Sequence, residues 1–342
     1  MAANPSKGRV VAIVGATGAV GEVLLRVLEE RAFPVAELRP LASERSTGTT
    51  ITFRGKQLPV ELVRPEAFEG ADFVFFAATG ELAKELAPEV VKRGAIAIDK
   101  SNTWRMDPQV PLCVPEINGA ALEKHQGIIA SPNCTTTPVV MALAPLRKLA
   151  KLESAVVTTF QSVTGAGLPG LEELDAQISA IAAGKPVPPP KKFARQIANN
   201  VVPLCETFMD DGYSTEEVKL LHETRKILDD PNFKVSMTCV RVPVPVGHSS
   251  SVLLETSPAI TPEAAREAFA AFPGIRVLDD PKHNVFPTAA DVAGQDDVLI
   301  GRVRRDLVSD RLWLWTVGDN LRKGAATNAV QIAEELMRRG LR

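Results

Sequence analysis

Two side chains in this sequence combine reactive chemistry with a suggestive position, Cys134 in IIASPNCTTTPVV and His248 in VRVPVPVGHSSS. Cys134 follows an apolar run that predicts a buried strand and precedes a run that predicts a helix. Asn133 is a good helix N-cap, so the thiol is expected in the first helical turn, where the helix dipole favours the thiolate. A free cysteine is most often a small buried hydrophobe, and core packing remains open at this point.

A glycine-rich turn near the N-terminus could bind a dinucleotide cofactor for chemistry at such a thiol. Gly15, Gly18 and Gly21 form GxxGxxG directly after RVVAIV, residues 9 to 14, and before a run with helical spacing. Glycines at a strand–helix junction let the backbone approach a pyrophosphate, and the helix N-terminus adds free N–H groups. The pattern predicts a dinucleotide site, and a tight packing turn is the alternative. A thiolate, an imidazole and a nicotinamide together could oxidise an aldehyde through a thioester.

The choice of dinucleotide depends on the turn ASERSTG at the end of the second predicted strand. An NAD site usually has a carboxylate here for the ribose hydroxyls. Ser43, Arg45 and Ser46 form a better cradle for a 2′-phosphate, although Glu44 is an unfavourable neighbour. NADP is favoured, and a solvated polar turn is the alternative. Expected cofactor contacts in the first turn are Gly15, Thr17, Gly18, Ala19 and Val20.

Alternating strands and helices must hold these groups in place. Strands are predicted at 9–14, 37–43, 71–78, 95–101 and 127–131, with helices after the glycine turn and at 81–94. This alternation predicts a parallel sheet with both faces covered. Further along, a helix is expected over TTPVVMALAPLRKLA, then a strand running into the loop SVTGAG, an exposed connection at 182–200 and a helix at 214–228. Three strands (KVSMTCVRVPV, SSVLLETS and VLIGRVRRD) and a C-terminal helix complete the prediction.

Composition limits the class of protein. The chain has 342 residues, 45% hydrophobic and 23% charged, with a formal net charge of −2, which predicts about two globular domains. The scattered basic residues do not predict a nucleic-acid or membrane surface. Without a signal-peptide layout or a long apolar run, the expected compartment is the cytoplasm. The four cysteines include no CxxC pair, so neither a disulfide framework nor a metal site is expected.

The sequence resembles the aspartate-β-semialdehyde dehydrogenases along essentially its whole length. The matching blocks, in order, are VAIVGATGAVG, LASERSTG, NTWRMDP, VPEIN, SPNCTTT, FQSVTGAG, EEVKLLHETRKIL, CVRVPVPVGHS and GDNLRKGAATNAVQIAEEL. The resemblance implies an α/β fold with an NADP-binding Rossmann domain at 1–133, joined by the C-terminal helix at 321–342. It also implies a catalytic and dimerisation domain at 134–320. The implied activity is the reversible, NADP-linked interconversion of aspartate 4-semialdehyde plus phosphate with 4-aspartyl phosphate, which feeds lysine, threonine, methionine and diaminopimelate synthesis.

Carried over block by block, the resemblance makes Cys134 the nucleophile and His248 the acid/base, with Gln161 orienting the substrate. It implies the following substrate and phosphate residues: Arg241 for the α-carboxylate, Glu216 for the α-amino group, and Arg105, Lys219 and Asn133 around phosphate and substrate. Thr164, Gly165 and Asn320 match positions that line the nicotinamide half of the cofactor.

Residue chemistry agrees with these roles without requiring them. A zwitterionic substrate needs an arginine fork and a carboxylate held apart. Glu216 and Lys219 share a helix face, although a surface ion pair gives the same spacing. A strand-edge charge remains open for Arg241, and a satisfied polar side chain remains open for Gln161.

Some blocks depart from the family pattern. Lys100 and Asn102 stand where DNSS is usual, Thr164 begins a loop usually written SGAG, and FAATGEL at 76–82 replaces a more glycine-rich turn. These changes touch the cofactor and phosphate edges. N-acetyl-glutamyl-phosphate reductase shares the chemistry and is the closest rival, while a cofactor-sensing binding protein without turnover is a rival of another class. The implied assembly is a homodimer or homotetramer.

Overall fold

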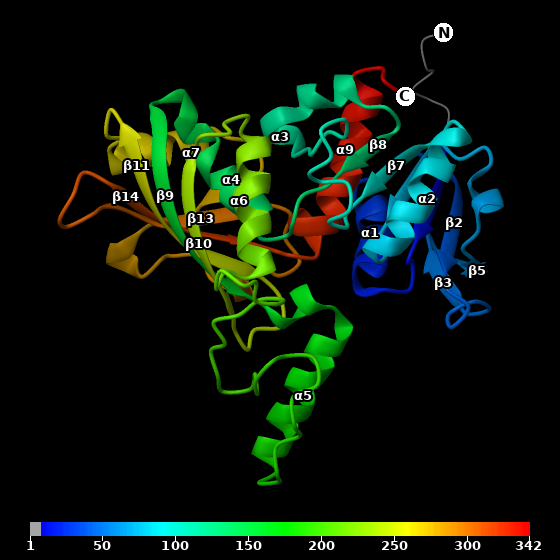
Figure 1. Cartoon of the computed structure of the whole chain (residues 1–342), viewed down its shortest axis with the longest axis horizontal. Coiled ribbons are helices and arrows are strands. Elements are labelled where there is room, and N and C mark those ends of the chain that lie inside the picture. The colour runs from blue at the N-terminus through cyan, green and yellow to red at the C-terminus, as the bar shows by residue number, and fades with distance from the viewer. Residues whose placement is uncertain (1–7) are drawn as a thin grey trace. The chain divides into compact units, whose positions relative to one another are not determined.

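The computed structural model describes residues 8–342, which form two compact units (Figure 1). Its first unit comprises the described residues up to 133 together with 325–342, and its second comprises 134–324. The chain thus returns to the first unit at 325, where the sequence placed the return at 321. Among the described residues, no helix is long and apolar enough to cross a membrane.

The first unit is built on a six-stranded parallel sheet in the order β5-β2-β1-β6-β7-β8. Its strands are β1 (Arg9–Val14), β2 (Val35–Ala42), β5 (Glu61–Leu62), β6 (Phe73–Phe76), β7 (Ile96–Asp99) and β8 (Ile128–Ala130). Its helices are α1 (Ala19–Glu30), α2 (Gly80–Lys92), α3 (Pro115–Asn118) and α9 (Thr327–Arg338), and a small hairpin joins β3 (Thr50–Phe53) to β4 (Lys56–Pro59).

Both faces of this sheet are covered, which explains why its strands are almost wholly apolar. Val74 and Phe76 of β6 pack with Leu86 and Val90 of α2. The alternate side chain Phe73 points to the other face, where its ring lies edge-on against Phe33 at 6.1 Å. On the helical side, α9 contacts both α1 and β7, so the last helix of the chain completes the first unit.

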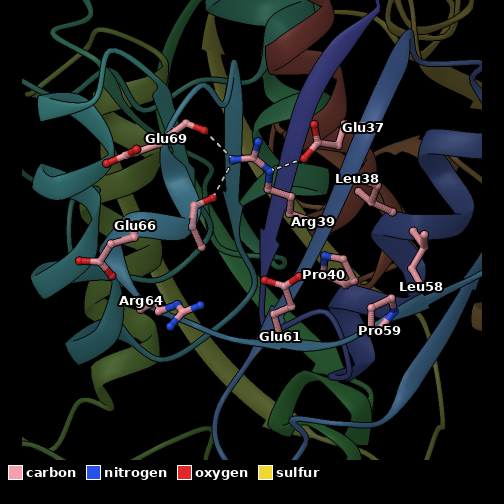
Figure 2. Close-up of a pocket in the computed structure, with 11 residues that line it drawn as sticks. Glu37, Leu38, Arg39, Pro40, Leu58, Pro59, Glu61, Arg64, Glu66 and Glu69 are labelled. Atoms are coloured by element: carbon pink, nitrogen blue, oxygen red, sulfur yellow. Dashed lines mark hydrogen bonds and ion pairs between the residues drawn. The ribbon is translucent and has the colours of Figure 1, made fainter.

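An open hollow of about 400 Å³ lies along β2 and β5 in the first unit (Figure 2). Arg39 points into it and donates to Glu37 and to the carbonyl oxygens of Ala67 and Glu69. The lining mixes arginines with four glutamates, and the Arg39 guanidinium already has protein partners. It lies beside the middle of β2, whereas the turn expected to bind a 2′-phosphate follows the end of that strand.

The second unit carries a mixed sheet in the order β10-β9-β11-β14-β13-β12. Its strands are β9 (Lys151–Gln161), β10 (Lys234–Arg241), β11 (His248–Ser257), β12 (Ile275–Val277), β13 (Val298–Arg305) and β14 (Leu312–Gly318). Its helices are α4 (Thr136–Leu143), α5 (Leu168–Ala182), α6 (Thr215–Ile227), α7 (Pro262–Ala270) and α8 (Ala289–Val292). The chain from 183 to 213 is irregular, as expected for a segment rich in proline and lysine.

One face of the mixed sheet packs against helices and the other stays partly open. Helix α4 contacts β14 and α6, and α6 contacts β10. Along β9 the side chains alternate between buried and partly exposed, and Val156 on the open face is 49% exposed. The rings of Phe160 and Trp315 stack on the same face with centroids 5.3 Å apart.

The predicted fold class, a parallel-sheet domain followed by a second α/β domain, is confirmed. Two local predictions are wrong. The helix after Cys134 does not run to residue 150: it ends at Leu143, and a 3-10 turn at Pro145–Lys148 follows, because proline cannot continue the hydrogen-bond ladder. The four strands expected in the second domain also omitted β12 and β14.

Candidate active site

Cys134 and His248 meet in the second unit, with Sγ 3.3 Å from Nε2. The imidazole is 1% exposed and belongs to the first residue of β11. The N-cap expected at Asn133 is wrong: the capping position is Thr135 and α4 begins at Thr136, so the thiol lies in the turn just before the helix. The pair has the contact that a nucleophile and its acid/base require.

Two glycines allow the backbone to pass close to Cys134 and His248. A side chain on Gly324 would place its Cβ 2.9 Å from Cys134 Cβ, and one on Gly165 would lie 3.0 Å from His248 Nε2. Real Cβ atoms essentially never come within 3.0 Å of another heavy atom, so a side chain on Gly324 would displace Cys134. A side chain on Gly165 would lie 2.8 Å from Arg241 Nη1 and would crowd both Arg241 and His248. Gly165 was expected beside the cofactor. Gly324 was missed because the run KGAAT indicates a contact between small residues only weakly.

The other ring nitrogen of His248 is held by Ser162. The Ser162 N–H donates to Nδ1 at 3.0 Å, and Ser162 Oγ lies 3.1 Å from the same atom. A backbone N–H can only donate, so this contact favours the neutral ring with its proton on Nε2, facing the thiol. Burial, with the nearby Arg241 cation, lowers the pKa of His248 well below its ordinary value. The imidazole is therefore neutral at physiological pH.

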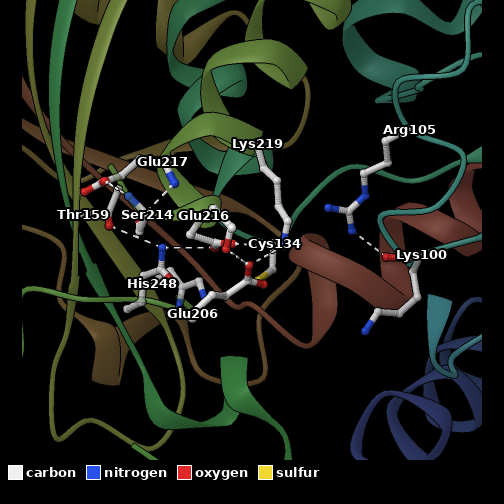
Figure 3. A network of polar contacts seen from close by, with 12 residues as sticks. Lys100, Arg105, Cys134, Thr159, Glu206, Ser214, Glu216, Glu217, Lys219 and His248 are labelled. Carbon is white, nitrogen blue, oxygen red and sulfur yellow. Dashed lines mark hydrogen bonds and ion pairs between the residues drawn. The ribbon is translucent and has the colours of Figure 1, made fainter. Parts of the chain in front are cut away.

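A second polar cluster surrounds α6 (Figure 3). Ser214 caps this helix through a reciprocal capping box with Glu217, which sets Glu216 and Lys219 on one face. Gln161 donates to Glu216 Oε1 at 3.3 Å, and Lys219 Nζ lies 4.0 Å from Glu216 Oε2. Glu216 is only 4% exposed, so the pair is not a solvated surface ion pair.

Lys219 also contacts the carboxylate of Glu206, which accepts from Thr215 Oγ1 at 2.7 Å. Two carboxylates therefore surround one ammonium group. Glu206 was missed by sequence reasoning because it stands in an irregular segment, where no periodicity marks a residue that points toward a site.

Arg241 and Gln161 end neighbouring parallel strands in register, β10 and β9. The Arg241 side chain is 5% exposed, donates from Nη1 to the Ser162 carbonyl at 2.7 Å, and lies over the Phe193 ring. It is a buried, anchored guanidinium rather than a strand-edge charge. The structure thus brings together Cys134, Gln161, Gly165, Glu216, Lys219, Arg241 and His248 in one unit.

Thr164 and Asn320 lie on the Nδ1 side of His248 and are bonded to each other. Asn320 Nδ2 donates to Thr164 Oγ1 at 3.0 Å, and Asn320 Oδ1 accepts from Ser162 Oγ and the Gly247 N–H, each at 2.9 Å. These side chains were expected to line the cofactor. In the structure these side chains form a buried network behind the imidazole, and their place beside the cofactor stays a prediction.

The remaining cysteines are poor nucleophiles. Burial raises the pKa of the Cys205 thiol to about 12 and raises that of Cys239 as well. Cys113 is fully buried. Cys134 alone is partly exposed among the four, all of which lie in the described chain. Within residues 8–342, no three His, Cys, Asp or Glu side chains form a group that could hold a metal ion.

The glycine turn of the first unit fits a nucleotide phosphate. Gly15 has φ +86°, and a Cβ there would lie 2.5 Å from the Ala77 carbonyl oxygen. Gly18 caps α1 without any side-chain hydrogen bond, and a Cβ there would meet only the Gly15 carbonyl oxygen, at 3.4 Å. The α1 N-terminus is therefore an open backbone cradle next to Thr17, Ala19 and Val20.

The turn after β2 holds Ser43, Arg45 and Ser46. The Ser46 N–H donates to the Ser43 carbonyl oxygen at 3.0 Å, closing the turn, and Ser43 and Arg45 are exposed. An exposed arginine on a closed turn can receive an anion without breaking an existing ion pair.

Arg105 and Asn133 also belong to the first unit. Arg105 is 7% exposed and donates from Nε to the Ser131 carbonyl at 3.0 Å and from Nη2 to the Lys100 carbonyl at 2.5 Å. The neighbouring Asp99 accepts from Ser101, and burial raises the pKa of its carboxyl group. Both of these acceptors are neutral carbonyl oxygens, and the Arg105 cation also acts electrostatically on Asp99.

Known proteins resemble this chain over nearly its full length. Family models for the semialdehyde dehydrogenase NAD-binding and dimerisation domains match residues 10–125 and 143–323. An aspartate-semialdehyde dehydrogenase of Aquifex aeolicus is 50% identical over 97% of this chain and 98% of its own, and one of Bacillus subtilis is 45% identical over 98% and 99%. The crystal structure of aspartate semialdehyde dehydrogenase II from Vibrio cholerae, complexed with ASA, superposes with a TM-score of 0.94 at 44% identity, covering 97% of this chain and 99% of that one. The chain belongs to the aspartate-semialdehyde dehydrogenase family.

Proposed function

We propose that this enzyme catalyses the reversible, phosphate-dependent oxidation of L-aspartate 4-semialdehyde to L-4-aspartyl phosphate, with NADP as cofactor. The biosynthetic direction is the reverse reaction, toward lysine, threonine, methionine and diaminopimelate. The observation that carries the proposal is the contact of Cys134 Sγ with His248 Nε2 at 3.3 Å, flanked by Arg241 and the Glu216–Lys219 pair. Relatives named for this substrate, up to 50% identical, support the choice of aldehyde.

Cys134 is the nucleophile in this scheme. Its sulfur attacks the aldehyde carbon and the thiol proton passes to the carbonyl oxygen, which gives a thiohemiacetal. His248 takes this hydroxyl proton as a hydride leaves the same carbon and the carbonyl of the thioester forms. A bound nicotinamide cofactor would supply the hydride acceptor for this oxidation. Phosphate then attacks the thioester carbon, and the thiolate of Cys134 leaves as 4-aspartyl phosphate forms.

Substrate recognition is assigned to the charged side chains around this pair. Arg241 receives the α-carboxylate and Glu216 the α-amino group, because a zwitterion is best held by opposite charges at separate points. Gln161, which bonds to Glu216, orients the intermediate. Lys219 and Arg105 supply positive charge for phosphate, and Asn133 is assigned to the substrate site on the family resemblance.

NADP is favoured over NAD because the turn after β2 offers Ser43, Arg45 and Ser46 for a 2′-phosphate, with Glu44 as the one unfavourable neighbour. The glycine turn of the first unit is assigned to the pyrophosphate. Thr164, Gly165 and Asn320 are assigned to the nicotinamide end on the family resemblance.

The assembly is proposed to be a homodimer or homotetramer that pairs through the open face of the mixed sheet. The family model for the dimerisation domain covers this sheet, and Val156, Phe160 and Trp315 present apolar surface there. A Val156→Asp variant should shift the mass measured by light scattering toward the monomer. A Leu307→Asp variant, changed at an exposed apolar residue in the turn between β13 and β14, should not.

One assay tests the reaction itself. Aspartate 4-semialdehyde should give NADPH only when phosphate is present, and N-acetylglutamate semialdehyde should be a far poorer substrate. A preference for the acetylated aldehyde would make the chain an N-acetyl-glutamyl-phosphate reductase. Cofactor binding without turnover of either aldehyde would make it a binding protein.

A further inference from the structure

Ser162 follows the last residue of β9 and contacts His248 through two different groups. Its backbone N–H donates to Nδ1 at 3.0 Å, and its hydroxyl oxygen lies 3.1 Å from the same nitrogen. Ser162 is fully buried and His248 is 1% exposed, so water does not substitute for either contact. One residue therefore offers Nδ1 both a donor and a hydroxyl that can accept.

The direction of the hydroxyl hydrogen bond is set by its neighbours. The Gly247 N–H donates to Asn320 Oδ1, which identifies that atom as the oxygen of the amide. Asn320 Oδ1 can then only accept, so the Ser162 hydroxyl proton points to it at 2.9 Å. With this proton engaged, a lone pair of Ser162 Oγ faces His248 Nδ1.

The far end of the network is fixed in the same way. Thr164 Oγ1 donates to the Pro245 carbonyl oxygen at 2.7 Å, and a carbonyl can only accept. The Thr164 oxygen is thereby left to accept from Asn320 Nδ2 at 3.0 Å. In this arrangement the Thr164 and Ser162 hydroxyl protons go to the Pro245 carbonyl and to Asn320 Oδ1. The 3.3 Å contact between Ser162 Oγ and Thr164 Oγ1 then carries no proton, and a lone pair remains at Ser162.

His248 needs such an acceptor in order to work as a base. With its proton on Nε2, the ring cannot take another proton at the atom that faces Cys134. The proton must instead reside on Nδ1, so that Nε2 is free to receive the hydroxyl proton of the thiohemiacetal. A small rotation of the ring exchanges Nδ1 between the Ser162 N–H and the Ser162 hydroxyl, since the two contacts differ by only 0.1 Å.

We propose that Ser162 is a positioning residue whose hydroxyl, oriented by Asn320 and Thr164, accepts a hydrogen bond from the Nδ1–H of His248. This hydrogen bond favours the tautomer in which Nε2 is free to act as the base. This inference rests on the proposed function only in that His248 is the acid/base. The Ser162 hydroxyl also stabilises the imidazolium after proton transfer, because that cation carries a proton on both nitrogens. Without the hydroxyl, a buried imidazolium beside Arg241 has no partner at Nδ1.

The test compares Ser162→Ala with Ser162→Thr, which keeps the hydroxyl. Ser250→Ala is the matched control, because it removes a buried hydroxyl of β11 that has no hydrogen-bond partner. Ser162→Ala should lower kcat by about 10- to 100-fold, part of the 10²–10⁴ that acid/base catalysis contributes. Its acidic limb in the pH profile of kcat/KM should move to lower pH, because the imidazolium has lost a partner. Ser162→Thr should recover most of both effects, and Ser250→Ala should change neither.

A merely structural Ser162 would lower the melting temperature without moving the acidic limb. An unmoved limb in a folded Ser162→Ala enzyme would therefore overturn the inference, as would an equal loss of rate in Ser250→Ala. His248→Asn separates this failure from a failure of the proposed function. If the acidic limb persists in His248→Asn, His248 is not the base, and the assignment of the acid/base is itself wrong.

Discussion

The two units make their candidate sites from different materials. In the first, the nucleotide cradle is backbone: Gly15 and Gly21 allow β1, α1 and the chain after β6 to approach closely, and no side chain caps α1. In the second, the site is made of buried side chains, with His248, Arg241 and Glu216 each at most 5% exposed and each bonded to a neighbour.

This difference has consequences for substitution. A backbone site tolerates changes in side-chain chemistry but not added volume, because its donors are N–H groups that every residue except proline carries. A side-chain site tolerates little chemical change even at constant volume, because each buried polar group left unpaired costs about 1–3 kcal/mol.

The largest effect is expected for Cys134→Ser, which is nearly constant in volume. A hydroxyl has a much higher pKa than a thiol and cannot carry a thioester, so kcat should fall by several orders of magnitude. NADPH binding, measured by fluorescence titration, should be unchanged because the glycine turn is untouched. Near-normal turnover would show that Cys134 is not the nucleophile and that its thiol only packs in the core.

Alkylation provides an independent check on the same thiol. One equivalent of iodoacetamide should label Cys134 alone, with protection by substrate, because burial raises the pKa of Cys205 and Cys239. Mass spectrometry of tryptic peptides locates the adduct. Labelling spread over the buried cysteines would contradict the distinction drawn between them.

A smaller effect is expected for Lys219→Ala. Losing a charge-assisted hydrogen bond of about 1.5–3 kcal/mol should raise the phosphate KM by roughly 10- to 100-fold. Lys151→Ala, which breaks a Lys–Glu pair on β9, is the matched control and should not change it. Glu206→Gln should lower the phosphate KM a few-fold, because one of the two carboxylates beside the ammonium is neutralised. Unchanged phosphate saturation in Lys219→Ala would remove Lys219 from the phosphate site.

The sequence predicts the strands of the first unit better than those of the second. Strand–helix alternation located every strand of the parallel sheet except the two-residue β5, since strands buried on both faces are continuous apolar runs. In the second unit, β14 was missed because LWLWTVG follows a polar turn without a clear alternation signal. Residues in motifs, such as Gln161 and Arg241, could be found from the sequence. Ser162 and Glu206 could not, because their significance lies in contacts between distant segments.

Two glycine-to-alanine substitutions test the glycine turn of the first unit. They differ in the space available to the added methyl group. A Cβ at Gly21 would lie 2.2 Å from the Gly15 carbonyl oxygen, so Gly21→Ala should cost about 1–3 kcal/mol of unfolding free energy. Gly18→Ala meets its nearest protein atom at 3.4 Å, and its stability should change by only a few tenths of a kcal/mol. It should nevertheless weaken NADP binding, because its methyl group enters the cradle. Urea titration and cofactor titration measure the two quantities, and intact NADP affinity in Gly18→Ala would place the pyrophosphate elsewhere.

A modest effect is expected where the first unit depends on a side chain, at Arg45. Replacing it by alanine removes one guanidinium from an exposed turn, so the affinity for NADP should fall about tenfold while that for NAD stays nearly constant. Arg64→Ala is the matched control, an exposed arginine of the same unit that lines the hollow beside β2 (Figure 2). Equal losses for both cofactors in Arg45→Ala would remove the case for 2′-phosphate recognition at this turn. A selective loss of NADP in Arg64→Ala would instead place the 2′-phosphate in the hollow, where Arg39 would have to exchange its carbonyl partners for the ligand.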